Sequence, residues 1–335
     1  MSMSKNKKWK NALLGSGLPL EYLVANKLEK LDIYVTGEYS FWRPNENRVN
    51  TEFSVDLLAS RFFEQTEGKE DFWGELRFLV ECKYNYPGVK WVFSPFPQEH
   101  ELIIGFINTL QDFTVTRINR ELLNSFDGIF NYCLKGIELH EDGVNPQSII
   151  RGINQLRYGS VQLSKTFIAD QVGSWHDSEL LIAFLCPILI TTAPLYVVKQ
   201  DLLLEDFHSA DNIEDVTRNV EAVIVNPDIG VELKKYIKAV ELELRNSWPE
   251  LDERLKNLSD ILRNSNYDGY YMTDSFLLEN ALRRSSERIL VVNYDAFEKI
   301  IQNIVHLVSS TKSTLRRYAT LEYHKETHKA FIRPI

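Results

Sequence analysis

Apolar residues recur at helical spacing near the start of the chain and give way to strand-like segments further on. Leu20, Val24 and Leu28 share one face of a predicted helix over 18–31, and Pro19 suits its first turn. The next three segments have the β-branched and aromatic content of strands, and the second and third are expected to pair as an antiparallel hairpin. The predicted strands are IYVTGEYSFW (33–42), TEFSVDLLASRFF (51–63) and ELRFLVECKY (75–84), with EQTEGKED (64–71) as the turn of the hairpin.

The rest of the chain alternates between helical and strand-like patterns. From 85 to 146 prolines interrupt the pattern, so we interpret this stretch as an insertion without assigned elements. Residues 147–171 predict a helix that Gly152 and Gly159 weaken. The elements predicted beyond it are strands at 186–192, 193–199, 221–227 and 289–294, a turn at 265–271, and helices at 230–263 (broken near Trp248-Pro249), 275–288 and 295–312.

This alternation favours an α/β fold. We expect a core over residues 1–200 that contains the insertion, followed by an α/β to helical region over 201–335. Strands continue beyond residue 200, so the second region is expected to be a separate unit or continuous with the core.

The composition describes a globular chain without a disulfide framework. With 335 residues and 44% hydrophobic content the chain is long enough for one large domain or two, and a net charge of -9 excludes a bulk-basic nucleic-acid coat. Cys82, Cys133 and Cys186 lie far apart, which argues against disulfides or a cysteine zinc site. The basic N-terminus is not followed by an apolar signal core, and Pro187 and Pro194 interrupt the longest apolar run. We therefore expect a cytoplasmic protein.

Charged residues stand inside two of the predicted strands. Glu81 and Lys83 follow the apolar run 78–80, and they point the same way because side chains alternate along a strand. Asp56 is a lone charge in the preceding strand, and the hairpin can bring it opposite or diagonal to Glu81. Neighbouring carboxylates repel unless a proton or a cation lies between them, and Mg²⁺ is often held by one or two carboxylates. The pattern therefore indicates a metal site.

Asp56, followed by Glu81-Cys82-Lys83, resembles the catalytic signature of the PD-(D/E)XK nuclease superfamily, which has the restriction-endonuclease-like fold. The resemblance covers residues 18 to about 200 and departs from the family name at Val55, where the name has proline. It implies a central mixed sheet flanked by helices, here with an insertion and a mostly helical C-terminal extension.

Two helices extend the resemblance. The predicted helix over 18–31 bears Glu21, and the first core helix of the family often bears an acidic residue. The predicted helix over 147–171 is similar to the second core helix, where Gln155 and Tyr158 match the glutamine and tyrosine that often point into the site. Their separation is one residue shorter than in one nuclease branch, so a packing role for both stays open.

The resemblance implies a divalent-metal-dependent nuclease that hydrolyses phosphodiester bonds, with DNA favoured, in restriction, repair or phage defence. Asp56, Glu81 and the backbone carbonyl of Cys82 are expected to hold Mg²⁺, and Mn²⁺ is expected to substitute. Lys83 is expected to orient the attacking water. Glu21 is expected to support a second metal or the hydration shell.

Nucleic acid, with DNA favoured, is the expected partner, and no membrane partner is expected. The region after residue 200 is expected to contact substrate or the second subunit of a homodimer. The best candidates for phosphate contacts are the basic clusters Lys5 to Lys10, Arg283-Arg284 and Arg316-Arg317.

Other interpretations remain open. Glu81 and Lys83 alone are typical of a structural ion pair, and Glu21 alone is typical of a carboxylate favoured at a helix start. His324 and His328 have the spacing of a helical zinc pair, but their basic surroundings favour solvated side chains. The alternative function is a non-catalytic nucleic-acid-binding or interaction module on a nuclease-like fold.

Overall fold

The computed structural model of the chain describes fourteen stretches, and the statements below concern these alone. They are residues 8–44, 49–67, 70–96, 108–109, 116–118, 130–141, 143–145, 147–173, 181–248, 251, 274–309, 315–317, 319–324 and 329–334.

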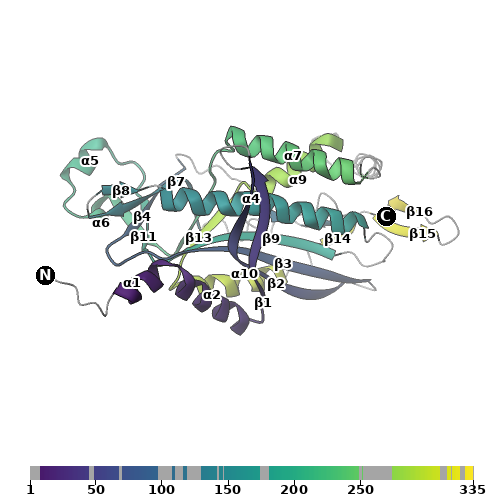
Figure 1. Cartoon of the computed structure of the whole chain (residues 1–335), viewed down its shortest axis with the longest axis horizontal. Helices are drawn as coiled ribbons and strands as arrows, with labels where there is room; N and C mark the ends of the chain where they lie inside the picture. Colours follow the sequence, from purple (N-terminus) through teal and green to yellow (C-terminus); the bar gives the residue numbers. More distant parts are fainter. Residues whose placement is uncertain are drawn as a thin grey trace.

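One large mixed sheet organises the described residues (Figure 1). Its strands lie in the order β1-β2-β3-β9-β13-β12-β7-β4-β10-β11, with β5 paired to β9 and β8 paired to β7. The strands are β1 (Tyr34–Pro44), β2 (Asn50–Glu67), β3 (Glu70–Lys83), β4 (Lys90–Pro95), β5 (Asn108–Thr109), β7 (Asn131–His140), β8 (Gly143–Asn145), β9 (Leu181–Thr191), β10 (Leu195–Val198), β11 (Thr217–Val220), β12 (Ala222–Val225) and β13 (Ile289–Asn293). Two small pairs join β6 (Thr116–Ile118) to β14 (Leu315–Arg317) and β15 (Ala319–His324) to β16 (Lys329–Pro334).

Helices cover both faces of this sheet, so the protein is an α/β fold with a large mixed sheet flanked by helices. In Figure 1, α4 crosses the middle of the molecule, α7 and α9 lie above it, and α2 and α10 lie below. The helices are α1 (Lys8–Gly15), α2 (Leu18–Lys30), α4 (Gln147–Gly173), α5 (Leu204–Ser209), α6 (Ile213–Val216), α7 (Val231–Ser247), α9 (Asp274–Arg284) and α10 (Phe297–Ser309).

The apolar core has three layers. Leu20, Val24 and Leu28 of α2 pack with the buried face of α10 against one face of the sheet. Buried residues of α4, such as Ile153 and Leu156, pack against the other face. A third cluster lies between α4 and the pair α7 and α9. Helix α4 is therefore enclosed on two sides, which is why apolar residues occur on more than one of its faces.

The sequence analysis predicts half of these elements. The helix over 18–31, the strands over 33–42, 51–63 and 75–84, and their antiparallel hairpin are confirmed. The strand pairing continues to Glu67↔Glu70, so 64–71 is mostly strand and the predicted turn is too long. Strands at 186–192, 193–199, 221–227 and 289–294 are confirmed within a few residues, as are the helices at 147–171, 275–288 and 295–312. The helix at 230–263 is confirmed as far as Ser247, close to the predicted break at Trp248. Residues 252–263 of that prediction and the turn at 265–271 lie outside the described residues.

Two regions that the sequence analysis sets apart from the core contribute strands to its sheet. In the stretch 85–146, β4 and β7 pair with each other and lie between β12 and β10. In the region after 200, β12 and β13 lie between β9 and β7. Strands from before and after residue 200 therefore share one sheet, and the region after 200 has strands as well as helices.

No helix in the described stretches is long and apolar enough to cross a membrane.

The two glycines of α4 mark close approaches between the helix and the sheet. A Cβ on Gly152 would lie 2.7 Å from Leu189 Cδ1 and 3.4 Å from Lys83 Cε. A Cβ on Gly159 would lie 3.1 Å from both Leu79 Cδ2 and Val55 Cγ2. The residues that weaken the helix in isolation therefore let it lie close to β3 and β9.

We expect Gly152→Ala to lower the free energy of unfolding by about 1 kcal/mol. Overpacking against buried Leu189 costs about 1–3 kcal/mol, which outweighs the gain of about 1 kcal/mol in helix propensity. Urea unfolding of Gly152→Ala, Leu189→Val and the double variant measures this. The free energy of unfolding of the double variant should be higher than the sum of the two single changes predicts, because Leu189→Val makes room for the added Cβ. A stabilised Gly152→Ala would show that α4 has free space at this position.

Candidate active site

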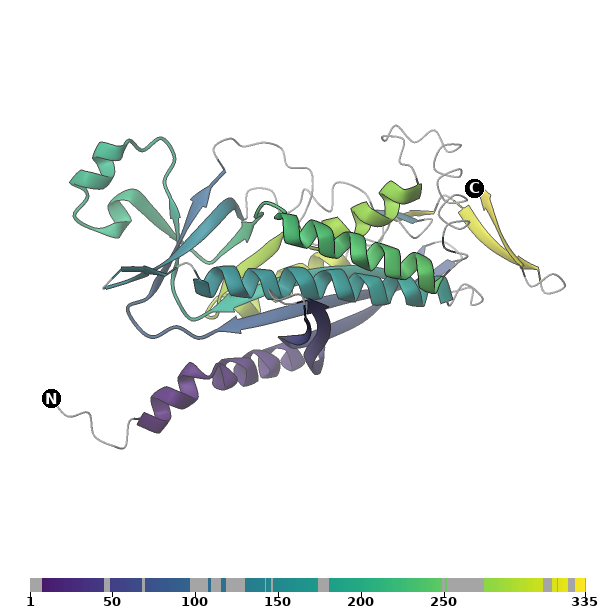
Figure 2. The same cartoon turned by 45° about the horizontal axis from the view of Figure 1, so that its top comes forward.

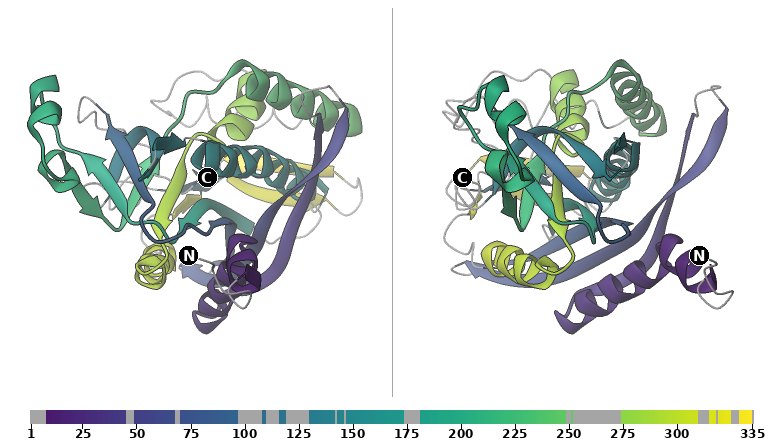
Figure 3. Two further views of the ribbon diagram at one scale, coloured as in Figure 1. Left: turned by 60° about the vertical axis from the view of Figure 1, so that its left-hand side comes forward. Right: turned by 90° about the vertical axis from the view of Figure 1, so that its left-hand side faces the viewer.

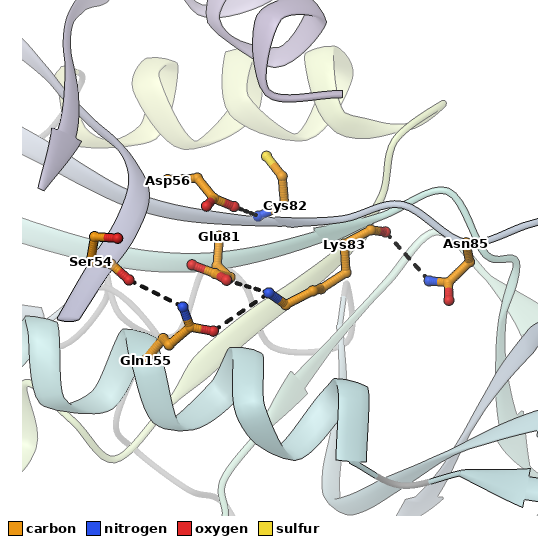
Figure 4. A network of polar contacts seen from close by, with 7 residues as sticks. All are labelled: Ser54, Asp56, Glu81, Cys82, Lys83, Asn85 and Gln155. Atoms are coloured by element: carbon orange, nitrogen blue, oxygen red, sulfur yellow. Dashed lines mark hydrogen bonds and ion pairs between the residues drawn. The ribbon is translucent and has the colours of Figure 1, made fainter. Parts of the chain in front are cut away.

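The C-terminal end of β3 presents two charges toward α4. Phe78, Val80 and Cys82 belong to the core cluster on the α2 and α10 face, and Leu79 belongs to the cluster beneath α4. Glu81 and Lys83 continue the Leu79 series, because side chains alternate along a strand. Both charges therefore lie between the sheet and α4, as Figure 4 shows.

Strand β2 leaves β3 at the level of Asp56. The β2–β3 ladder ends at the pair Leu57↔Val80. On the other side of β2, Gly37↔Leu58 is followed by Tyr39↔Val55, so that Glu38 alone faces Asp56 and Leu57. This is a β-bulge, which bends a strand and redirects a side chain. At this level the β2–β3 ladder ends, so the last residues of β3 have no ladder partner on β2.

The Asp56 carboxylate accepts a hydrogen bond from a β3 backbone N–H that lies beyond the end of the β2–β3 ladder. The Cys82 backbone N–H donates to Asp56 Oδ2 at 2.7 Å. Asp56 is thereby fixed next to the chain segment that carries Glu81 and Lys83 (Figure 4). The Cys82 thiol is buried on the opposite face of the sheet, and burial raises its pKa well above the ordinary range, so only the backbone of Cys82 belongs to the site.

Lys83 connects Glu81 to α4. Its ammonium donates to Glu81 Oε1 and makes a longer contact of 3.5 Å to Gln155 Oε1. The Gln155 amide donates to the Ser54 carbonyl at 3.1 Å, which ties α4 to β2. Glu81 has no exposed surface, while the Lys83 side chain is 26% exposed. Lys83 therefore lies between the buried carboxylate and solvent.

The surroundings disfavour the charged form of both carboxylates. Burial, and then the charge of Asp56, raises the pKa of Glu81 to about 7, although Lys83 partly opposes the shift. Burial also raises the pKa of Asp56, and the Cys82 N–H and Lys83 oppose that shift. Glu81 Oε2 is buried and has no hydrogen-bond partner. An acceptor of this kind is costly unless a proton or a cation reaches it.

Glu21 lies at the edge of this cluster. Burial raises the pKa of Glu21 most, and the charges of Asp56 and Glu38 raise it further, while Lys83 lowers it. Its Oε1 is 3.0 Å from the position of a Cβ on Gly17, which has φ 84 and precedes α2. A side chain at residue 17 would be strained and would meet Glu21, so glycine keeps this helix start open.

Glu38 is a candidate residue that the sequence analysis did not identify. It is exposed, faces Asp56 at the bulge, and its charge raises the pKa of both Glu21 and Asp56. The available sequence signal was a carboxylate in the strand 33–42 that pairs with the Asp56 strand. The sequence does not reveal the register shift between the two strands, so it could not show that Glu38 lies opposite Asp56.

A second network holds the chain just after Lys83. The Asn85 N–H donates to Thr192 Oγ1 at 2.8 Å, and the Thr192 hydroxyl donates to the Asn85 carbonyl at 3.0 Å. The Asn85 amide donates to Thr191 Oγ1 at 2.8 Å and contacts the Lys83 carbonyl at 3.4 Å. These contacts fasten the end of β3 to the end of β9, and the sequence analysis missed them because the partners are far apart in the chain.

The Tyr158 ring contacts residues outside the cluster of Asp56, Glu81 and Lys83. The Arg43 guanidinium lies over the Tyr158 ring at 4.0 Å and over the Phe53 ring at 3.9 Å. Tyr158 also packs edge-on against Tyr236 of α7, with ring centroids 4.9 Å apart. Tyr158 therefore helps to hold the β1–β2 hairpin against α4 and α7, while Gln155 reaches the charged cluster.

The predicted phosphate-contact residues also lie apart from this cluster. Arg283 and Arg284 belong to the last turn of α9, on the far side of α4 from the sheet, and Arg283 pairs with Glu287 at 3.1 Å. Arg316 and Arg317 lie on β14, where Arg316 is opposite Arg117 of β6. Nothing in the described contacts connects either pair to Glu81.

The donor set fits a hard cation held by few protein ligands. In the described part of the chain, no group of three or more His, Cys, Asp or Glu side chains is spaced to hold a metal. Asp56 and Glu81 supply carboxylate oxygens, and one oxygen of Glu81 is a buried acceptor without a partner. Mg²⁺ is often held by one or two carboxylates with several waters, so the residues present fit it.

Comparison with protein-family models, with curated proteins and with solved structures gives no match to this chain.

We expect the metal-free protein to lose stability as pH rises from 5 to 8, and Glu81→Gln to lose less. The folded pKa of Glu81 is about 7 against an ordinary value of 4.5. The folded state therefore binds more protons between these values, and the stability it contributes is lost as pH rises through 7. The difference between the two proteins should change by up to about 3 kcal/mol.

Chemical unfolding in EDTA across this pH range measures the difference. Glu243→Gln, which removes the charge of an exposed ion pair with Lys165, is the matched control and should follow the wild type. Parallel curves for wild type and Glu81→Gln would contradict a raised pKa at Glu81.

Proposed function

We propose that the chain is a divalent-metal-dependent nuclease that hydrolyses phosphodiester bonds, with DNA as the favoured substrate. The observation that carries the proposal is Glu81. It is fully buried, one of its oxygens bonds to Lys83, the other has no partner, and Asp56 lies next to it. A bound cation would compensate both carboxylates. The Asp56 backbone N–H also favours the charged form of Glu81, but less than burial and the Asp56 charge disfavour it.

The order of elements supports a restriction-endonuclease-like core. Helix α2 is followed by β1, β2 and β3, then by α4 and β9 after the intervening strands. These four strands are neighbours in the order β1-β2-β3-β9, with α2 on one face and α4 on the other. Glu21, Asp56, Glu81, Lys83 and Gln155 come from the elements on which the resemblance expects them.

Each residue of the site would have its own role in metal binding or in the reaction. Asp56, Glu81 and the Cys82 carbonyl would hold Mg²⁺ or Mn²⁺. The metal, when bound, would polarise the phosphate and make water more acidic. Lys83 would orient the attacking water and stabilise negative charge that builds on the phosphate. Gln155 would hold the Lys83 ammonium toward the site, and Glu21 would support a second metal or the hydration shell.

A cleavage assay tests the reaction. We expect the purified chain to cut circular DNA, linear DNA or RNA in Mg²⁺ or Mn²⁺, and to be inactive in EDTA. Asp56→Asn and Glu81→Gln should abolish cleavage in the same preparations while the proteins stay folded. Wild-type protein that binds DNA without cutting it in either metal would support the alternative, a non-catalytic nucleic-acid-binding module.

Lys83→Ala should lower turnover by roughly a hundredfold or more with little change in substrate affinity. Lys165→Ala is the matched control, because Lys165 makes an ion pair from α4 to Glu243 of α7 and should leave turnover unchanged. Single-turnover rates, DNA affinity and melting temperature are measured for both variants. Unchanged turnover of Lys83→Ala with a fall in its melting temperature would show that Lys83 forms a structural ion pair only.

A further inference from the structure

The connection between β10 and β11 presents apolar side chains in an acidic setting. Residues 201–215, the acidic lobe, contain α5 and α6, and neither helix has a buried residue. Leu203, Leu204 and Phe207 are exposed, with Leu204 69% exposed. Every charged side chain of the lobe is acidic, apart from His208 if it is protonated: Asp201, Glu205, Asp206, Asp211, Glu214 and Asp215. Exposed apolar side chains gathered in this way indicate an interaction surface.

The acidic lobe is held in shape by its own hydrogen bonds. Asp206 Oδ2 accepts from the Leu203 N–H at 2.7 Å, and Asp215 Oδ2 accepts from the Asn212 N–H at 2.8 Å. The Lys199 ammonium donates to the carbonyl of Glu214 at 2.8 Å. The lobe therefore presents its apolar side chains in a preformed arrangement, which lowers the entropy cost of binding.

Helix α1 has the opposite charge and a similar apolar content. It has no buried residue, and Trp9 is 64% exposed. Leu13 lies one turn further along the same face, and Lys8 and Lys10 flank Trp9. Tyr86 holds this helix in place, since its hydroxyl donates to the Asn11 carbonyl at 2.9 Å.

We propose that α1 of one copy of the chain docks on the acidic lobe of a second copy, and that the contact is reciprocal. Figures 1 and 2 show α1 and the acidic lobe at the same end of the molecule, on opposite sides of it. The right-hand view of Figure 3, which faces that end, shows the two elements on opposite sides of it. A two-fold axis at this end would pair each α1 with the other copy's lobe, as an isologous dimer requires.

Complementarity favours a second copy over nucleic acid as the occupant. The acidic lobe repels phosphate, while its leucines and Phe207 match the apolar face of α1. Lysines at the edge of that face can pair with the acids at the edge of the lobe. This inference does not depend on the proposed nuclease activity.

Charge reversal with rescue tests the proposal. We expect sedimentation velocity of the wild type over a concentration series to show reversible dimers. Lys8→Glu with Lys10→Glu, and separately Glu205→Lys with Asp211→Lys, should each shift the protein to monomer. An equimolar mixture of these two variants should dimerise again, because the reversed positions of α1 in one variant can then pair with the reversed positions of the lobe in the other.

The substituted positions are exposed, and Asp206 and Asp215 are left unchanged because they cap backbone groups. Melting temperatures should therefore stay at the wild-type value. Lys234→Glu with Lys238→Glu on the exposed face of α7 is the control and should not change the association. Phe207→Ser should also weaken the dimer.

Three results would overturn the proposal. The first is a wild type that stays monomeric throughout the series. The second is a mixture of the two reversed variants that fails to dimerise although both are folded. The third is association that is unaffected by Lys8→Glu with Lys10→Glu while DNA affinity falls, which would assign α1 to nucleic acid.

Discussion

The buried charge of Glu81 is the constraint on which the rest of the site depends. A carboxylate without exposed surface, beside a second carboxylate, is costly unless a proton or a cation compensates it. Lys83 compensates one oxygen only. The departure of β2 from β3, the position of Gln155 on α4 and the close approach at Gly152 all arrange groups around this charge.

The sheet supplies the rigidity that such a site needs. Strand β3 is paired to β2 over most of its length and to β9 throughout the site. Asn85, Thr191 and Thr192 fix the chain where β3 ends, so the backbone just after Lys83 is held to the end of β9. The bulge at Glu38 lies at the level where the β2–β3 ladder ends. Of the ion pair, Glu81 is therefore enclosed and only the Lys83 side chain is partly exposed.

Local pattern was sufficient for the elements around the candidate site and for noticing the charged residues that the structure brings together there. Helix α2, the β2–β3 hairpin and strand β9 follow from apolar spacing, and Asp56, Glu81 and Lys83 were detectable as charges in apolar strands. Long-range pairing was not predictable in this way. Strands β12 and β13 lie between β9 and β7, so the sheet joins segments that are far apart in the chain. The local sequence pattern shows neither this strand order nor the fact that strands from 85–146 belong to the sheet. Glu38 and the Asn85 network were missed for the same reason. The packing role that the sequence left open for Tyr158 agrees with its contacts to Arg43 and Tyr236.

Proton release on metal binding tests the central claim most directly. Calorimetric titration of Mn²⁺ into the protein near pH 6.5, in buffers of different ionisation enthalpy, counts the protons released for each ion bound. Since Glu81 has a pKa of about 7, a cation that binds its carboxylate should release more than half a proton in the wild type and almost none in Glu81→Gln, whose affinity should also fall. Absence of Mn²⁺ binding to the wild type, or equal binding and proton release in both proteins, would contradict the account.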